Sequence, residues 1–265
     1  MHWNAAKERL HAAMFAPLRP IIEWLPKEDW PSHEGLTSAA AGITTARGMP
    51  VRFVTPRDHT DRERRYYEQH IAETGEVETR PENWHDLFNA LAWIAYPRAK
   101  AAINAQHAAI LEERGEAEAK RRSPERDALT LFDEGGVAVV STDPALFQLI
   151  IDFEWKTLFW HKRADLERHM RFLAFGHALF ENGLDPHLGM VAKTVFIPTE
   201  SMPAEDTLVE TVDRALAVHF SDRARFATPK IMAPIPVLGI PGWYSGTATE
   251  SYYDDVRHFR GKSAK

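Results

Sequence analysis

Apolar residues recur along much of the chain at the spacing of helices that face a core. The segment 84–96 predicts a helix buried on nearly all sides, because its large apolar residues cover most of a helix circumference: Trp84, Leu87, Phe88, Leu91, Trp93, Ile94 and Tyr96. Thr79-Arg80-Pro81-Glu82 predicts its start, with Thr79 as a cap. Pro97 should kink this helix or begin a new one, which runs on to about Arg114. Other helical patterns cover 1–15, 61–73, 204–220 and 143–181, the last with one break near residue 162.

Strand patterns are fewer and shorter. Val51–Val54 and Val191–Ile197 are β-branched or aromatic runs of strand length. Ala128–Phe132 and Val137–Val140 flank an Asp-Glu-Gly-Gly sequence, and together they predict a β-hairpin. The chain is therefore expected to be α+β, predominantly helical, with a small sheet of three or four strands including one β-hairpin.

A length of 265 residues suits a single domain over 1–265. Within it, 1–50 reads as an irregular, aromatic-rich N-terminal segment. The tail 229–265 carries Pro229, Pro234, Pro236 and Pro241, which indicates an extended Pro-rich C-terminal wrap.

Composition removes several function classes. The formal net charge is -6, with no basic excess, which disfavours nucleic-acid binding. The chain has no cysteine, so thiolate nucleophiles, disulfides and Cys-based zinc sites are excluded. No apolar run approaches the roughly 20 residues that span a bilayer, and the N-terminus lacks a signal-peptide core. These features predict a cytoplasmic protein with no membrane association. Phosphate-binding glycine loops and the nucleophile elbow are also absent from the sequence.

The first candidate site lies on the helix predicted to be buried. His85 and Asn89 are about 40° apart on one helical face, and Asp86 is about 100° round from His85. Burying such groups without partners would cost several kcal/mol, so they should be paired, liganded or catalytic. In the functional interpretation His85 is a base or ligand, Asp86 orients it or joins a metal, and Asn89 positions a substrate. In the structural interpretation they cap the helix or bond to nearby backbone.

A second candidate is the stripe formed by Arg98, Lys100 and Asn104, with His107 beyond them. It predicts a substrate-binding edge that holds an anion near His85. The alternative is a solvated polar face opposite an Ala-rich packing face.

Two further groups could hold a cation. Asp133 and Glu134 are adjacent carboxylates that could complete a catalytic site with a metal such as magnesium, or could be ordinary turn residues. His177 and Glu181 are one helical turn apart and could share a metal, although a lone His on a helix is more often structural or exposed. A divalent metal is thus a candidate cofactor, and the sequence leaves the cofactor open.

Several segments together resemble the bacterial family known as domain of unknown function 3025. They are Tyr67-Glu68, Asn83-Trp-His-Asp86, Phe88-Asn-Ala-Leu91, Tyr96-Pro-Arg98, Thr130-Leu-Phe-Asp-Glu134, Phe175-Gly-His-Ala-Leu179 and Pro236-Val-Leu-Gly-Ile-Pro-Gly-Trp243. The resemblance runs from about residue 50 to about residue 260, although Thr247–Glu250 departs from the Asn-Glu pair expected there. It implies one continuous unit and a bacterial source. The family has no established activity, so the resemblance implies no reaction.

Two functions are consistent with these residues. The leading hypothesis is a hydrolase-type or metal-assisted enzyme with its site around His85, Asp86 and Asn89, acting on an unknown small molecule. The alternative is a non-catalytic protein that binds or scaffolds a protein partner. In that case the same residues form a structural hydrogen-bond network, and Trp3, Trp24 and Trp30 form a docking surface.

Overall fold

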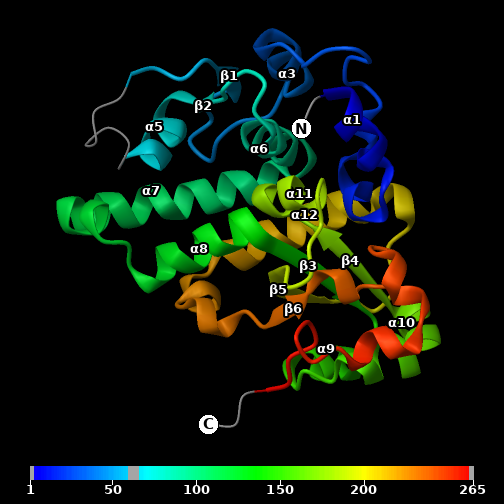
Figure 1. Cartoon of the computed structure of the whole chain (residues 1–265). Coiled ribbons are helices and arrows are strands. Elements are labelled where there is room, and N and C mark those ends of the chain that lie inside the picture. Colours follow the sequence, from blue (N-terminus) through cyan, green and yellow to red (C-terminus); the bar gives the residue numbers. More distant parts are fainter. Residues whose placement is uncertain (1–2, 59–65, 263–265) are drawn as a thin grey trace.

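The long helix α7 (Pro97–Lys120) crosses the middle of the computed structural model, which describes residues 3–58 and 66–262. The smaller sheet and helices α3, α5 and α6 lie on one side of α7, and the larger sheet lies on the other (Figure 1). The other α-helices are α1 (Trp3–Lys7), α2 (Arg19–Ile22), α3 (His33–Ala39), α5 (Tyr67–Thr74), α6 (Trp84–Ala95), α8 (Pro124–Gly135), α9 (Pro144–Ile151), α10 (Arg163–His169), α11 (His177–Gly183) and α12 (Glu205–Ser221). A π-helical turn covers Thr157–His161. Short 3₁₀ turns cover Glu8–His11, Ala13–Leu18, Arg223–Phe226, Pro229–Ile231, Val237–Gly239, Ser245–Ala248 and Glu250–Asp254.

The strands form two sheets. They are β1 (Arg52–Val54), β2 (Glu76–Glu78), β3 (Gly136–Ser141), β4 (Met170–Ala174), β5 (Val191–Pro198) and β6 (Pro234–Pro236). Strands β1 and β2 pair in parallel, while the larger sheet has the order β4-β3-β5-β6. In the larger sheet β3 and β5 are parallel, and the two outer pairs are antiparallel. The predicted fold class, predominantly helical α+β with a small sheet, is confirmed.

Strand β3 is the centre of the core, because all six of its residues are buried. Val137 and Val139 belong to one cluster of buried side chains, whereas Ala138 and Val140 belong to another. Successive side chains of a strand point to opposite faces, so the two clusters lie on the two faces of the sheet. The second cluster includes residues of α7, α8 and α12, and these helices cover that face.

Local signals explain where the site helices begin. The side chain of Asn83 accepts a hydrogen bond from Asp86 N, so Asn83 caps α6, and the prediction of Thr79 as the cap is wrong. The expectation of a kink or a new start at Pro97 is confirmed, because α7 begins there after the non-helical Tyr96. Ser123 caps α8 in the same way as Asn83 caps α6.

The predicted hairpin at 128–140 is wrong. Residues 124–135 form α8, which starts with Ser123 as its cap and Pro124 in its first turn. Ala128, Leu129 and Phe132 are buried at helical spacing, and Asp133 lies near the end of the helix instead of in a turn between strands. Short apolar runs fit either structure, and here packing on the sheet selected the helix.

The helical pattern predicted over 143–181, with one break near residue 162, is wrong at residues 170–174. Met170–Ala174 forms β4, which pairs antiparallel with β3. A five-residue strand between two helices shows no separable period in sequence. Pairing with β3 decided its conformation.

The two terminal segments both contribute to the core. Trp3 is 5% exposed and stacks on Trp84 with ring centroids 5.3 Å apart, and Trp30 lies 4.5 Å from the same ring. In the Pro-rich tail, Ile235 is buried in the edge strand β6. In the part of the chain described, no helix is both long and apolar enough to cross a membrane.

Candidate functional site

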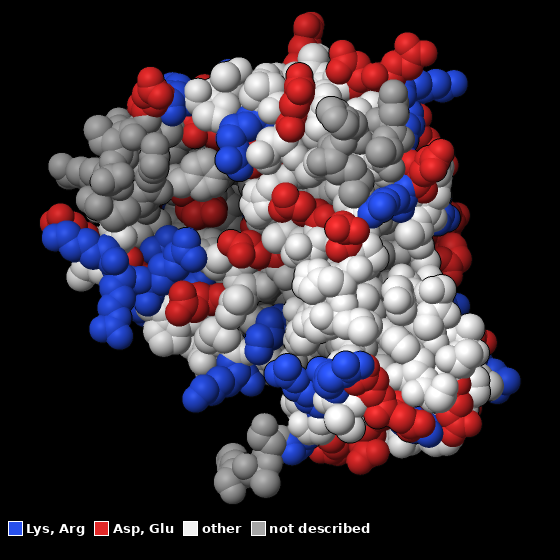
Figure 2. Space-filling view, viewed as in Figure 1, with Lys and Arg blue, Asp and Glu red and all other residues white. Residues whose placement is uncertain are grey.

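A polar cleft of about 470 Å³ opens where α5, α6, α7, α8 and α11 meet. Its walls carry many of the chain's buried or half-buried polar side chains, among them Glu68, His85, Asn89, Lys100, Asn104, His107, Asp133, Glu134 and His177. Figure 2 shows a hollow on the left of the viewed face, with red side chains in and around it and a group of blue side chains to its left and below.

Two histidines from different helices meet at the wall of the cleft. His85 Nε2 and His177 Nε2 are 3.1 Å apart, and the rings stand edge to face at 81°. His85 Nδ1 is 2.9 Å from Glu181 Oε2, and His177 Nδ1 is 3.5 Å from Asp133 Oδ2. Each imidazole therefore has a carboxylate behind it, in the arrangement that orients a catalytic base.

Counting protons shows that the neutral pair is one proton short. His85 Nδ1–H donates to Glu181, because a carboxylate accepts, so His85 Nε2 is an acceptor. If His177 Nε2–H donates to it, the buried Nδ1 of His177 faces Asp133 without a proton and has no hydrogen-bond partner. If His177 instead carries its proton on Nδ1, the two Nε2 lone pairs face each other. One added proton satisfies all four nitrogens.

Burial keeps that proton off the buried ring in the free protein. Burial lowers the pKa of His177 to about 4, and Asp133 offsets only part of this effect. His85 is the more accessible ring, with its side chain 36% exposed, whereas the side chain of His177 is 9% exposed. His177 is therefore an unprotonated base at neutral pH.

Lys100 holds the inner end of this chain of contacts. Its Nζ donates to Asp133 Oδ1 at 2.6 Å and to Asn89 Oδ1 at 2.9 Å, and its side chain is 5% exposed. Burial alone would raise the pKa of Asp133, but Lys100 and His177 outweigh it and leave that pKa below its usual value. Asp133 thus remains ionised behind His177.

The deep end of the cleft is formed by α5 and α7. Asn104 Nδ2 donates to the backbone oxygen and to Oε2 of Glu68, each at 2.8 Å. Burial, followed by the negative charge of Asp133, raises the pKa of Glu68. Burial likewise raises the pKa of the neighbouring Tyr67 well above 10.

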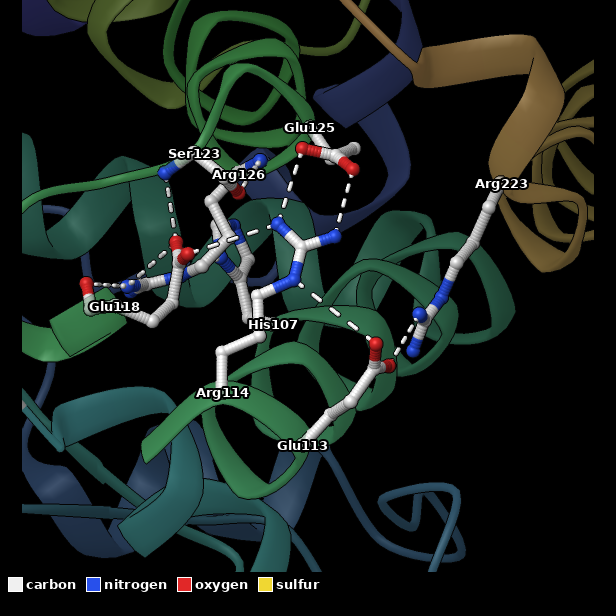
Figure 3. A network of polar contacts seen from close by, with 8 residues as sticks. All are labelled: His107, Glu113, Arg114, Glu118, Ser123, Glu125, Arg126 and Arg223. Carbon is white, nitrogen blue, oxygen red and sulfur yellow. Dashed lines mark hydrogen bonds and ion pairs between the residues drawn. The ribbon is translucent and has the colours of Figure 1, made fainter. Parts of the chain in front are cut away.

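A second polar network fixes the turn between α7 and α8 (Figure 3). Arg126 Nε donates to His107 Nδ1 at 3.2 Å, and Arg126 Nη1 donates to the backbone oxygen of Glu118 at 3.2 Å. Glu118 Oε1 accepts from Ser123 N at 2.7 Å. Because His107 lines the cleft, this network links the α7–α8 turn to the site.

Asp86 was predicted to orient His85, but in the structure it pairs with Arg80 instead. Asp86 Oδ2 accepts from Arg80 N and Nε, each at 2.8 Å, and Oδ1 accepts from Arg80 Nη2 at 2.9 Å. The residue that hydrogen-bonds to His85 is Glu181, which lies 96 positions away in the sequence. Asp86 still lines the cleft, as does its ion-pair partner Arg80.

The stripe on α7 divides into two parts. Lys100, Asn104 and His107 are buried and line the cleft, so the alternative of a solvated face is wrong for them. Arg98 is half exposed, lies outside the cleft lining and contacts Asp213 on α12 at 3.6 Å. Asp213 itself accepts hydrogen bonds from the backbone N–H groups of Arg98 and Ala99 and so anchors the start of α7.

The remaining candidates are placed as follows. Asp133 and Glu134 both line the cleft from the last turn of α8. His177 and Glu181 both hydrogen-bond to His85. His177 contacts Nε2 of His85, and Glu181 contacts its Nδ1. Within residues 3–58 and 66–262, no group of three or more His, Asp or Glu side chains is arranged to hold a metal ion. A shared metal at His177 and Glu181 stays a prediction.

Glu68 and Tyr67 are cleft residues that sequence reasoning did not single out. They lie in the first turn of a short charged helix, where a carboxylate is common for local reasons. The one signal available was that Tyr67-Glu68 falls among the segments that carry the family resemblance.

Comparison with known proteins agrees with that resemblance. A family model described as "Protein of unknown function (DUF3025)" matches residues 51–263. The chain belongs to this family. The DUF3025 match contains every residue that lines the cleft and begins after Trp3 and Trp30. No curated protein and no solved structure matches the chain.

Proposed function

We propose that this DUF3025 protein is a hydrolase-type enzyme whose cleft activates a water molecule by general acid–base catalysis. The observation that carries the proposal is the contact between His85 Nε2 and His177 Nε2, with a carboxylate behind each ring and a polar cleft in front. A pair that lacks one proton is suited to take that proton from a nucleophilic water or hydroxyl.

The roles follow from position. His85, the more exposed ring, accepts the proton on Nε2 when His177 carries its own proton on Nδ1, and Glu181 holds the tautomer of His85 by accepting from its Nδ1. His177 shares the proton through the Nε2 contact, and Asp133 stabilises the charge that the pair gains. Lys100 and the amide nitrogen of Asn89 are the donors next to this centre, where they can stabilise negative charge that develops on the substrate.

The test is a panel of chromogenic substrates for hydrolases: p-nitrophenyl acetate, p-nitrophenyl phosphate, bis-p-nitrophenyl phosphate and an amino-acid p-nitroanilide. We expect hydrolysis of at least one class, reduced about 10²- to 10⁴-fold in His85→Ala, the usual contribution of a general base. Glu181→Gln should lower kcat with less effect on KM. His161→Ala, at an exposed histidine outside the cleft lining, is the matched control and should hydrolyse at the wild-type rate.

Absence of hydrolysis across the panel, or equal activity in His85→Ala and wild type, would contradict the proposal. Metal content measured by mass spectrometry on wild type, His85→Ala and His177→Ala tests the metal-assisted form of the same function. A stoichiometric metal lost in either variant would add a metal to the site.

The alternative is a binding or scaffold protein, and one observation favours it. Lys100, Asp133 and Asn89 form a buried network whose contacts resemble those of a structural core. The two interpretations differ at His85, which is partly exposed. If the network is only structural, His85→Ala should lower stability and change no ligand binding. In a functional site the same variant folds normally and loses activity.

A further inference from the structure

The amide of Asn104 is held in one orientation at the deep end of the cleft. Its Nδ2 is 2.8 Å from the backbone oxygen of Glu68, and a carbonyl oxygen can only accept, so the nitrogen must be on that side. The carbonyl oxygen Oδ1 therefore points away from Glu68. Oδ1 is buried and has no hydrogen-bond partner.

An unpartnered, buried amide oxygen is unusual in a folded protein and calls for a donor. Asn104 as a whole is only 2% exposed and lines the cleft. Lys100 donates to Asp133 and Asn89, and Arg126 donates to His107 and Glu118, and none of these hydrogen bonds reaches Asn104 Oδ1. A ligand in the cleft could supply the missing donor.

The charge around Asn104 also favours a donor over an anion. Glu68 accepts from Asn104 through one oxygen and lies in the negative field of Asp133. Burial is the main cause of its raised pKa, and the negative charge of Asp133 adds to that effect. A group with N–H donors could hydrogen-bond to both the Glu68 carboxyl and the Asn104 amide oxygen. An anion would be repelled by both oxygen-bearing groups.

We infer that Asn104 and Glu68 form a subsite for a nitrogen group of the substrate that donates two hydrogen bonds, one to Asn104 Oδ1 and one to the carboxyl of Glu68. Ammonium, guanidinium and primary amide groups share this chemistry. Asn104 lies four residues beyond Lys100, which is about 6 Å along the axis of α7. The nitrogen group would therefore be bound roughly one helical turn from the bond that reacts.

This inference deepens the proposed function and rests on it for the view that the cleft holds a substrate. Binding alone tests it, so failure of the subsite and failure of catalysis can be told apart. The probes are methylguanidinium, acetamide and acetate, which are of similar size and differ in charge and donors. They are titrated at pH 7 into the full-length ¹⁵N-labelled protein, and the side-chain amide resonances of Asn104 are followed.

Methylguanidinium and acetamide should shift the Asn104 resonances in a saturable way, and acetate should not. Glu68→Gln keeps the shape of the side chain but removes its charge, so it should weaken methylguanidinium about tenfold or more and leave acetamide within a few-fold. Glu134→Gln, at another acidic residue that lines the same cleft, is the matched control and should change neither affinity. His85→Ala should lose hydrolysis and keep probe binding.

Three results would overturn the subsite: acetate binding as tightly as methylguanidinium, equal effects of Glu68→Gln and Glu134→Gln, or no probe shifting Asn104. If His85→Ala loses probe binding together with hydrolysis, the nitrogen group is bound at the histidine pair and the subsite is wrong as placed. Binding to methylguanidinium but not acetamide, or the reverse, identifies which nitrogen group the subsite takes.

Discussion

Replacing Lys100 by methionine tests how strongly the buried centre of the site is coupled. Methionine has a similar length and no charge, so the variant removes the ammonium that is 2.6 Å from Asp133 and leaves a carboxylate that is 17% exposed without its counter-ion. Removing one partner of a buried ion pair typically costs about 3–5 kcal/mol. A domain is stable by only about 5–15 kcal/mol, so the loss should be large. For a chain of this size it corresponds to a fall in Tm of roughly 5–9 °C.

The pH dependence of the loss identifies its cause. In the wild type the pKa of Asp133 is below its usual value, so its ionisation stabilises the fold above that value and the contribution is lost on acidification. In Lys100→Met, burial should raise the pKa of Asp133 above the unfolded value of about 3.9. The folded variant then takes up a proton more readily than the unfolded chain does. The penalty should therefore be full at pH 7 and shrink as the pH approaches 4.

Urea denaturation of both proteins from pH 4 to pH 7 measures this penalty, and Asp133→Asn completes a double-mutant cycle. The double variant should be less destabilised than the sum of the single variants. Lys162→Met, at an exposed lysine that is 3.1 Å from Asp165, is the matched control and should leave the midpoint unchanged. A loss below about 1 kcal/mol at pH 7, or a loss independent of pH, would refute the buried-charge argument.

Two further predictions concern the frame of the site. Burial, with Arg126 beside it, lowers the pKa of His107 to about 3, so the unfolded chain gains protons first as pH falls below 6.5 and stability drops. His107→Gln can still accept a hydrogen bond from Arg126, but it does not titrate. The variant should therefore lose up to about 3 kcal/mol less stability than the wild type between pH 7 and pH 4. Urea denaturation measures this loss, and an equal loss in both proteins would contradict the prediction. Gly75 and Gly48 both have positive φ, at 73° and 79°. They differ in the space around them: an added Cβ would be 2.0 Å from the Pro50 oxygen at Gly75, but would have no neighbour within 4 Å at Gly48. Gly48→Ala should therefore cost about 1 kcal/mol and Gly75→Ala more than about 3 kcal/mol, and equal thermal midpoints would contradict the steric account.

Much of the site could be foreseen because buried polar residues stand out in apolar helices. His85 and Asn89 lie in a segment whose other residues are nearly all apolar, and that contrast is visible without a structure. The spacing of Lys100 and Asn104 placed them on one face of a helix, but the sequence could not show whether that face is exposed to solvent or buried. The Ala-rich surface beside them fits either, and only the packing of α5 and α8 over the stripe made it the floor of a cleft.

By itself, the sequence determined the helix start at Pro97, the lack of thiol chemistry, the predominantly helical fold class and the helix that carries His85. These depend on local propensity and on the periodicity of one segment at a time. Tertiary structure decided that residues 128–135 are a helix, that 170–174 is a strand, and that Glu181 instead of Asp86 binds His85. The reason is physical: a pattern shows which face of an element is buried, but the partner that buries it comes from another element. Glu68, Asp133 and His177 line one cleft only because α5 and α8 pack against α7 and α11 packs against α6 and α8.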